Sequence, residues 1–566
     1  MRMSRYRPWT WAVAVLAAVA SLAAAVLVPR DRGADRLVAV AAAAAGVEDD
    51  GADCAVSSGS PAANSKLPDP FTRMNGTRIT STSDWRCRRA EIRELAERSV
   101  YGQKPAKPGS VTGTVSRTGI TVNVSDQGRS ASFSATVDLP SGTGPFPAVV
   151  VLGGLGADTA TIKASGAAVV SFDPTTVGRE GTPRSNKQGA FYSIYGASSS
   201  TGLLMAWSWG VSRIIDVIEQ SGGGILRADA TGVTGCSRYG KGAFVAGAFD
   251  QRIALTMPIE SGSGGTNIFR GVPGESGAQP LSSAYSEQPW LGDAFGSYTG
   301  NPAGLPVDTH QIVAMVAPRG LLVMENPHIE WLGARSGSVA ALGGAEVYKA
   351  LGAGSNISYW SDVQDGTHCA VRPEWRTPLQ QSIGKFLRQT GSAPGVFRVA
   401  PSKSGSLSQW RDWTTPTLTD GGTSGGTTTG GTTTGGTTTG GTTTGGTTTG
   451  GTTTGGTTTG GSTGGTGDSC TAAHRIVNSW SGGYQGEVTV RNTSTTALGG
   501  WSVGMTLASG QTLSQVWNGQ NTGTSGTVTI RNTAWNGSVA PGAGATFGFV
   551  VSGGSAAPAN LTCAGS

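Results

Sequence analysis

A glycine–threonine repeat in the second half of the chain sets the strongest limit on what the chain can fold into. From residue 420 to about 467 the sequence is almost entirely Gly-Gly-Thr-Thr-Thr. Such a segment has no apolar side chains to bury, so nothing offsets the conformational entropy lost on ordering it. We therefore predict a linker over 420–467, about 48 residues long and spanning roughly 35–40 Å as a flexible coil. The remaining residues form at least two separate bodies.

The N-terminus has the pattern of an export signal. Three arginines within the first seven residues precede an apolar run over 9–28, and a second run over 37–45 ends in small residues. This pattern predicts a signal peptide over 1–46 and a secreted, extracellular protein. The alternative is an uncleaved membrane anchor, because the first run is just long enough to span a bilayer.

The charge content argues against a nucleic-acid partner, and the cysteine content indicates disulfides. Only 13% of the 566 residues are charged, the formal net charge is +6, and Lys and Arg are not clustered. Nucleic-acid binding needs a basic patch, so we expect no nucleic-acid partner. The six cysteines suit an oxidising compartment and include no CxxC pair, which favours disulfides over a metal site.

The positions of the six cysteines narrow the possible disulfides. One pair brackets the last body, one pair lies together before the first predicted strand of the sheet, and the other two are left for each other. The expected disulfides are Cys54–Cys87, Cys236–Cys369 and Cys470–Cys563.

The first body, residues 52–415, alternates short apolar runs with helical stretches. Runs over 147–152 and 167–172 are bounded by glycine, as buried parallel strands are, and 202–219 has helical periodicity. Further expected strands lie at 230–236, 253–258, 320–324 and 357–360, and further helices at 242–248, 310–316, 338–351 and 378–388. This alternation predicts a three-layer, doubly wound α/β fold.

A serine lies where one of these strands passes into a helix. In Gly235-Cys236-Ser237-Arg238-Tyr239-Gly240, small residues flank Ser237. A sharp strand–turn–helix connection of this kind is a nucleophile elbow, which presents the serine hydroxyl to a substrate. Ser237 is therefore a candidate nucleophile for acyl transfer in an α/β-hydrolase.

A nucleophilic serine needs a base and an acid that orients the base. Of the four histidines, His368 lies on a loop after the last expected strand, where α/β-hydrolases carry their base. Cys236 precedes the serine and Cys369 follows this histidine, so a disulfide between them would suit a serine–histidine contact. Glu260 and Glu325 each end a later strand, so either could be the acid, and chain order alone favours Glu325.

Four segments together resemble one enzyme family. Residues 235–243, 259–265, 331–333 and 366–369 are similar to the glucuronoyl esterases, carbohydrate esterase family 15, and the resemblance covers most of 52–400. It implies an α/β-hydrolase domain with Ser237 as nucleophile, His368 as base and Glu260 as acid. Some bacterial members use an acid at the later strand end, so Glu325 stays the alternative.

The same resemblance implies how the substrate is held. Arg238 would stabilise the oxyanion, although it can also be read as a surface arginine in a salt bridge. The residues implied to bind the hydroxyls and ring of a glucuronic acid are Lys241, Gln279, Glu287 and Trp331. Lys241 lies one helical turn beyond the serine, and the alternative for Trp331 is simple core packing.

The last body, residues 470–566, shows strand-like runs separated by Gly, Asn and Ser turns, which predicts a small all-β sandwich. Trp501 leads an alternating strand and is expected in the core. Trp480, Trp517 and Trp535 lie in turns, and this pattern resembles a family 2 carbohydrate-binding module that binds cellulose through three tryptophans. The alternative is that these tryptophans close the ends of the sandwich.

These observations predict a secreted, monomeric serine esterase without a cofactor. We expect a carboxylic ester hydrolase of the 4-O-methyl-glucuronoyl methylesterase type, which cleaves esters between glucuronoxylan and lignin and is targeted to cellulose. Two alternatives remain at this point: another carbohydrate esterase, such as an acetyl xylan esterase, and a non-catalytic wall protein that binds polysaccharide.

Overall fold

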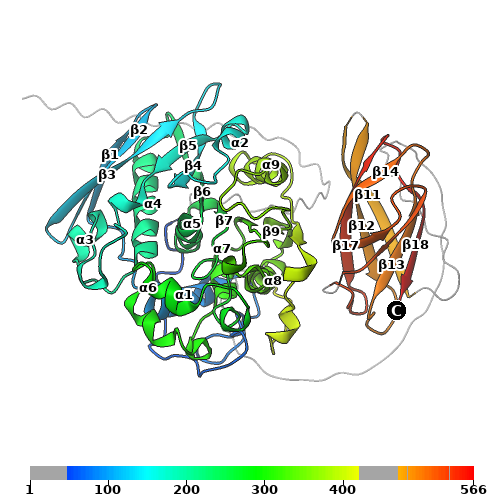
Figure 1. The fold of residues 1–566 in the computed structure, drawn as a ribbon, viewed down its shortest axis with the longest axis horizontal. Coiled ribbons are helices and arrows are strands. Elements are labelled where there is room, and N and C mark those ends of the chain that lie inside the picture. The colour runs from blue at the N-terminus through cyan, green and yellow to red at the C-terminus, as the bar shows by residue number, and fades with distance from the viewer. Residues whose placement is uncertain (1–46, 420–468, 481, 534–535) are drawn as a thin grey trace, which may run out of the picture. The chain divides into compact units, whose positions relative to one another are not determined.

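The computed structural model describes residues 47–419, 469–480, 482–533 and 536–566, which form two bodies (Figure 1). The predicted signal peptide over 1–46 and the predicted linker over 420–467 lie outside the described residues. Within the described residues, none of the helices combines the length and the apolar character that a membrane span requires.

The larger body, 47–419, is built on one mixed sheet with the strand order β1-β2-β3-β5-β4-β6-β7-β8-β9-β10. From β5 to β10 all neighbours are parallel, whereas β1, β2 and β3 form an antiparallel extension paired to β5. The strands are β1 (Ser110–Val115), β2 (Gly119–Asp126), β3 (Arg129–Asp138), β4 (Phe146–Leu152), β5 (Ala168–Phe172), β6 (Leu226–Cys236), β7 (Ile253–Ile259), β8 (Gly320–Met324), β9 (Ile357–Ser361) and β10 (Phe397–Val399).

The central strands are apolar along their whole length because both faces of the sheet are covered. In β4, Ala148, Val150 and Leu152 pack into one core, and the intervening Val149 and Val151 pack into the other. Successive side chains of a strand point to opposite faces, so a strand between two helix layers must be apolar at every position.

Helices cover both faces of this sheet (Figure 1). One core takes side chains from α1, α4, α5, α7 and α8, and the opposite core takes them from α2 and α9. The helices are α1 (Asp84–Ala96), α2 (Thr159–Ala164), α3 (Ala190–Tyr195), α4 (Leu203–Gln220), α5 (Arg238–Phe249), α6 (Leu281–Ser286), α7 (Thr309–Val316), α8 (Ala334–Ala350) and α9 (Arg376–Ser382). The predicted three-layer α/β fold is confirmed.

The register of the parallel strands brings their carboxyl ends to one edge. Cys236 at the end of β6 pairs with Ile259 of β7, and Ile259 pairs with Met324 of β8. The residues that follow these strand ends therefore emerge side by side. They include Ser237 and Glu260, as parallel α/β sheets require of a site at this edge.

The first described residues are packed in the larger body through buried charges. Glu48, which precedes the predicted boundary at residue 52, accepts a hydrogen bond from Arg213 of α4 and lies 2.8 Å from Lys104 Nζ. Arg252 joins the same group through Asp216 and Asp250, at 2.6 and 2.7 Å.

The smaller body, 469–566, consists of two antiparallel sheets ordered β11-β12-β17-β14 and β15-β16-β13-β18, which confirms the predicted sandwich. Its strands are β11 (Cys470–Trp480), β12 (Gly483–Asn492), β13 (Trp501–Thr506), β14 (Thr512–Trp517), β15 (Gln520–Thr522), β16 (Thr527–Arg531), β17 (Gly544–Ser552) and β18 (Ala559–Gly565). Trp501 is buried and stacks on Phe547 at 5.5 Å. The side chains of Trp480, Trp517 and Trp535 lie outside the described residues.

Three disulfides link the six cysteines in the expected pairs. The bridges are Cys54–Cys87, Cys236–Cys369 and Cys470–Cys563. The second joins positions 133 apart in the sequence and is part of the site described next.

Candidate active site

Ser237 occupies a tight turn between β6 and α5. Its φ of 59° and ψ of −126° lie outside the regions that ordinary side chains favour. The turn needs small neighbours: a Cβ at Gly235 would lie 2.7 Å from the Tyr239 carbonyl oxygen, and one at Gly240 would lie 2.5 Å from the Ile259 carbonyl oxygen. The Ser237 N–H donates to that same Ile259 oxygen at 2.9 Å, which ties the elbow to the next strand.

His368 contacts Glu260 through Nδ1, and its other ring nitrogen, Nε2, does not take part in this contact. The His368 Nδ1 lies 2.7 Å from Glu260 Oε2, and the Cys369 N–H donates to the same oxygen at 2.7 Å. The other oxygen of Glu260 lies 3.4 Å from Asn326 Nδ2 and 3.7 Å from Arg372 Nε. Glu260 is fully buried, and these donors satisfy its charge.

Glu325 has different partners. Its Oε1 accepts hydrogen bonds from the Thr266 hydroxyl at 2.7 Å and from the Ser261 N–H at 3.2 Å. Burial raises the pKa of Glu325 to about 7 despite these hydrogen bonds. Of the two candidate acids, the structure therefore places Glu260 on the histidine and gives Glu325 a separate set of buried contacts.

The Cys236–Cys369 disulfide lies against the histidine and the carboxylate. The two sulfurs, one His368 ring nitrogen and one Glu260 oxygen all lie within 4.8 Å of one another. Such a cluster would suit a metal only with free thiolates, but these sulfurs are bonded to each other. The cluster instead ties the loop of the serine to the loop of the histidine.

Arg238, the first residue of α5, is oriented by a carboxylate from another loop. Its Nη1 lies 3.1 Å from Glu180 Oε2, and the Trp290 indole N–H donates to the other oxygen of Glu180 at 2.6 Å. Arg238 remains exposed, so the salt bridge holds the guanidinium without removing it from solvent. Its backbone N–H belongs to the unpaired first turn of a helix, where a developing negative charge is stabilised.

Lys241 is buried one turn further along α5. Its Nζ donates to the carbonyl oxygens of Ser261 and Ser263 at 2.5 and 2.8 Å, and it lies 5.6 Å from the centre of the Trp290 ring. An ammonium has three N–H donors, so these two carbonyls leave one donor for a ligand. Burial lowers the pKa of Lys241 to about 8.

The other residues implied in sugar binding form one cluster. The Gln279 side-chain amide donates to Glu287 Oε2 at 2.8 Å, and the Gln279 backbone N–H donates to the Trp331 carbonyl oxygen at 3.0 Å. Trp331 is 53% exposed, and its ring lies edge-on to His368 at 5.9 Å. Core packing is therefore not the role of Trp331, because about half of this side chain is exposed to solvent beside the histidine.

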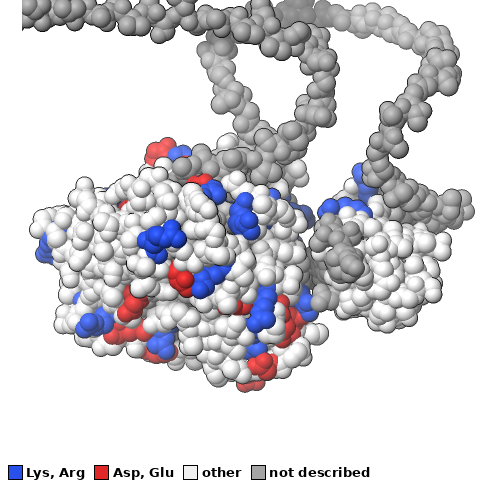
Figure 2. All heavy atoms as spheres, turned by 90° about the horizontal axis from the view of Figure 1, so that it is seen from above, with Lys and Arg blue, Asp and Glu red and all other residues white. Residues whose placement is uncertain are grey.

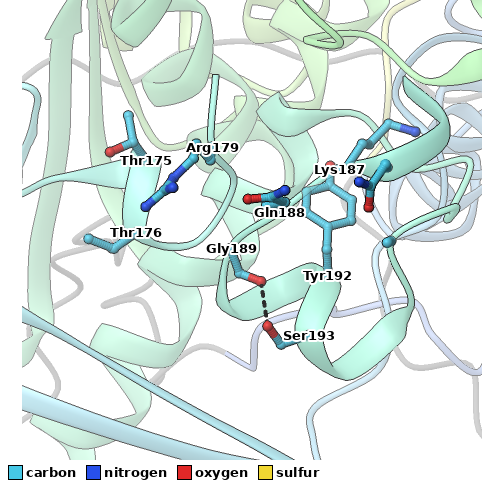
Figure 3. A pocket seen from close by; sticks show the side chains of 10 residues that line it. Thr175, Thr176, Arg179, Lys187, Gln188, Gly189, Tyr192 and Ser193 are labelled. Carbon is cyan, nitrogen blue, oxygen red and sulfur yellow. Dashed lines mark hydrogen bonds between the residues drawn. The ribbon is translucent and has the colours of Figure 1, made fainter. Parts of the chain in front are cut away.

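Two depressions lie along the loop that supplies Glu180. One of about 600 Å³ is lined by residues 181–184 and 285–289, which include Glu287. The other, of about 390 Å³, is lined by polar side chains such as Arg179 and Gln188 (Figure 3). On the face seen in Figure 2, charged side chains are scattered among uncharged ones and the basic ones form no continuous patch.

Sequence reasoning missed the residues that support the site from a distance. Glu180 comes from the loop after β5, and Asn326 and Arg372 flank Glu260. It also missed the glycine-rich loop after β4, in which a Cβ at Gly153 would lie 2.1 Å from the Tyr239 ring. That loop had a signal in the sequence, the run Gly153-Gly154-Leu155-Gly156, whereas Glu180 had none.

The fold and this arrangement define an α/β-hydrolase: an elbow serine after a central strand, and a histidine on a later loop that contacts a buried carboxylate. Residues 122–352 match the family model described as "Glucuronyl esterase, fungi". The chain is 38% identical over 377 residues to a 4-O-methyl-glucuronoyl methylesterase of Hypocrea jecorina, covering 65% of this chain and 80% of that one. The chain belongs to the glucuronoyl esterase family.

Other relatives and solved structures agree with this membership. A 4-O-methyl-glucuronoyl methylesterase of Neurospora crassa is 39% identical, covering 65% of this chain and 93% of that one. The solved catalytic domain of the Hypocrea jecorina glucuronoyl esterase has a TM-score of 0.60 at 38% identity, covering 64% of this chain and 99% of that one. Residues 470–566 match the family model described as "Cellulose binding domain", so the smaller body is a family 2 carbohydrate-binding module.

Proposed function

We propose that this enzyme hydrolyses the ester between 4-O-methyl-glucuronic acid of glucuronoxylan and a lignin alcohol, while its C-terminal module holds it on cellulose. The observation that carries the proposal is the 2.7 Å contact of His368 Nδ1 with Glu260 Oε2 beside the Ser237 elbow, in a chain of this family. A relative from Sporotrichum thermophile, 36% identical with a TM-score of 0.60, has been solved in complex with methyl 4-O-methyl-beta-D-glucopyranuronate; it covers 65% of this chain and 100% of that one.

The first step is attack on the uronoyl carbonyl carbon. The Ser237 hydroxyl forms the new C–O bond while His368 takes its proton. Because Glu260 occupies Nδ1 of the histidine, Nε2 is the nitrogen left to act as base. The buried carboxylate fixes the tautomer and stabilises the imidazolium that forms.

The negative charge that develops on the carbonyl oxygen needs a donor held in place beforehand. The Arg238 backbone N–H at the start of α5 and its guanidinium, held by Glu180 at 3.1 Å, supply this charge stabilisation. Collapse of the intermediate breaks the bond to the alcohol oxygen, which receives the proton from His368. Water then repeats the sequence on the acyl-serine and releases the free uronic acid.

Four residues near the serine bind the sugar: Lys241, Gln279, Glu287 and Trp331. Lys241 has one N–H left for a sugar oxygen, and Gln279 and Glu287 offer a donor and acceptors to the hydroxyls. The exposed Trp331 ring gives the sugar an apolar face on which to pack. A glucuronic acid in xylan is attached to a longer chain, and the depression of about 600 Å³ that Glu287 lines provides room beyond the sugar.

The rest of the proposal concerns location and partners. The pattern over 1–46 and the three disulfides are those of an exported protein. Trp480, Trp517 and Trp535 form the cellulose-binding surface of the C-terminal module, and the enzyme acts as a monomer.

The test is hydrolysis of methyl and benzyl esters of 4-O-methyl-glucuronic acid by the wild type and by Ser237→Ala, with acetylated xylan as the competing substrate. We expect the wild type to cleave both uronate esters and Ser237→Ala to lose about 10⁶-fold in kcat. Cleavage of acetyl groups without cleavage of uronate esters would assign the chain to another class of carbohydrate esterase. A rate unchanged in Ser237→Ala would exclude serine catalysis.

A further inference from the structure

Few large apolar side chains are exposed in the described residues, and most of those few surround the candidate active site. In the larger body they are Val47, Leu155, Trp331 and Val371. Trp331 lies beside Gln279, among the residues proposed to bind the sugar. Leu155 and Val371, 66% and 49% exposed, have no role in the steps above, although exposing such side chains to water is unfavourable.

Leu155 is carried to the site by the glycine-rich loop after β4. A Cβ at Gly156 would lie 2.8 Å from the Cys236 Cβ and 3.1 Å from the Cys369 Cβ, so the loop rests directly on the disulfide. Three residues before Gly156, Gly153 rests on the Tyr239 ring. Leu155 lies between these two contacts, and its own neighbours in the chain are glycines, which offer no polar side chain.

Val371 is held near the same place by its own neighbours. Cys369, two residues before it, donates to Glu260 Oε2 at 2.7 Å, and Arg372, directly after it, lies 3.7 Å from Glu260 Oε1. The chain therefore passes over the carboxylate that holds His368, with Val371 exposed between the two contacts. Two different loops thus bring Leu155 and Val371 next to residues that contact the disulfide and Glu260: Gly156 follows Leu155, and Arg372 follows Val371.

The chemistry of ester cleavage says which part of the substrate must come here. The alcohol oxygen takes its proton from His368 as the bond breaks, so the alcohol lies beside the histidine while Lys241, Gln279 and Glu287 hold the uronic acid. Leucine and valine side chains offer only apolar contact. They suit an alcohol with an apolar body and give nothing to a second sugar, which would need hydrogen-bonding partners.

We propose that Leu155 and Val371 form the contact surface for the alcohol part of the ester and make the enzyme prefer an arylalkyl alcohol to a small one. This inference rests on the proposed uronate esterase activity. It adds two specificity-determining side chains on loops outside the sugar cluster, and it assigns them to the leaving group.

The test compares kcat/KM for the benzyl and methyl esters of 4-O-methyl-glucuronic acid in Leu155→Ser, Val371→Ser, Leu155→Trp and the wild type. The matched control is Val47→Ser, since Val47 is 60% exposed and belongs to the N-terminal segment beside Glu48. We expect each serine variant to lower the benzyl-to-methyl ratio roughly 3- to 10-fold, as the loss of one or two partly buried CH₂ contacts does. Leu155→Trp is expected to raise the ratio and Val47→Ser to leave it unchanged.

The outcomes distinguish failure of the alcohol surface from failure of the uronate esterase activity. A ratio that stays at the wild-type value in both serine variants would overturn the alcohol surface, and so would an equal loss on both esters. Failure of the wild type to hydrolyse either ester would instead overturn the uronate esterase activity itself. A ratio that falls in the serine variants and rises in Leu155→Trp supports both.

Discussion

The Nδ1 of His368 lies 2.7 Å from Glu260 Oε2, and this carboxylate reaches the histidine from the strand next to the one that carries the serine. Glu260 has a φ of 46°, which non-glycine residues adopt only where surrounding structure imposes it. Ser237 and Cys369 also have positive φ values, 59° and 57°. Three non-glycine residues at the site thus share strained backbone, which is typical of positions kept for chemistry rather than stability.

Removing the disulfide beside the histidine should lower activity as well as stability. We expect the double variant Cys236→Ala/Cys369→Ala to lose about 2–5 kcal/mol of unfolding free energy and also to lose kcat, because the bridge ties the serine loop to the histidine loop. The control is Cys54→Ala/Cys87→Ala, which should lose stability alone. Denaturant titration and kcat on the methyl ester measure the two effects, and an unchanged kcat in the first variant would contradict the account.

The buried Lys241 should make substrate binding depend on pH. Burial lowers its pKa to about 8, so its charge is present below pH 8 and is lost above it. We expect KM for the methyl ester to rise between pH 7 and 9 in the wild type. In Lys241→Gln, KM should be raised roughly 10- to 100-fold, as expected for a lost hydrogen bond to a charged group, and it should no longer change with pH.

The control for the pH experiment is Lys349→Gln, which changes an exposed lysine in the last turn of α8 and should keep the wild-type profile. A wild-type KM that is flat from pH 7 to 9 would show that Lys241 does not bind the substrate through its charge.

Glu48 should make the larger body sensitive to acid. Burial opposes its charge, but Lys104 and Arg213 outweigh burial and hold the pKa of Glu48 at about 2, below its usual value of 4.5. A carboxylate with a lowered pKa stabilises the fold above pH 4.5, and this stabilisation is lost as pH falls from 4.5 to 2. We expect Glu48→Gln to cost about 3 kcal/mol at pH 7 and to flatten the loss of stability across that window.

Thermal or denaturant unfolding from pH 7 to pH 3 measures this effect, with the exposed Glu374→Gln as the control. If Glu48→Gln unfolds like the control at pH 7, the buried charge group contributes no net stability to the fold.

The tryptophans of the binding module should separate attachment from catalysis. We expect Trp480→Ala, Trp517→Ala and Trp535→Ala each to weaken binding to cellulose by about 30-fold or more, as loss of an aromatic hot spot does, and to leave hydrolysis of a soluble ester unchanged. The control is Ile476→Ser, which changes an exposed apolar residue of the same module. Binding isotherms on crystalline cellulose measure the affinity. Wild-type affinity in all three variants would show that these tryptophans do not bind cellulose.

Much of the fold could be predicted because its central strands are apolar on both faces, and β4 to β9 fall where apolar runs predict them. The antiparallel strands β1, β2 and β3 escaped prediction, since they alternate apolar and polar residues within a polar segment, as in Val122 and Val124 of β2. Alternation of apolar and polar residues is a weaker signal than a continuous apolar run. In addition, no helical segments lie between these three strands to show where each begins and ends.

The serine and the histidine candidates could be predicted because each lies in a local pattern, an elbow and a late loop. The acid could not be chosen from the residues alone, since Glu260 and Glu325 both follow strands that end at the same edge. The choice depends on side-chain direction: Glu260 turns to the histidine, whereas Glu325 turns to Thr266 and Ser261. Glu180 acts through a contact between distant loops, which no local pattern reports.

The most direct test of the central claim is kcat for benzyl 4-O-methyl-glucuronate in the wild type, Glu260→Gln and Glu325→Gln, all at pH 7. We expect Glu260→Gln to lose about 10⁴-fold in kcat, as loss of the orienting carboxylate does in a serine triad, and Glu325→Gln to lose far less. A severe loss confined to Glu325→Gln would contradict the assignment of Ser237, His368 and Glu260 as the catalytic triad.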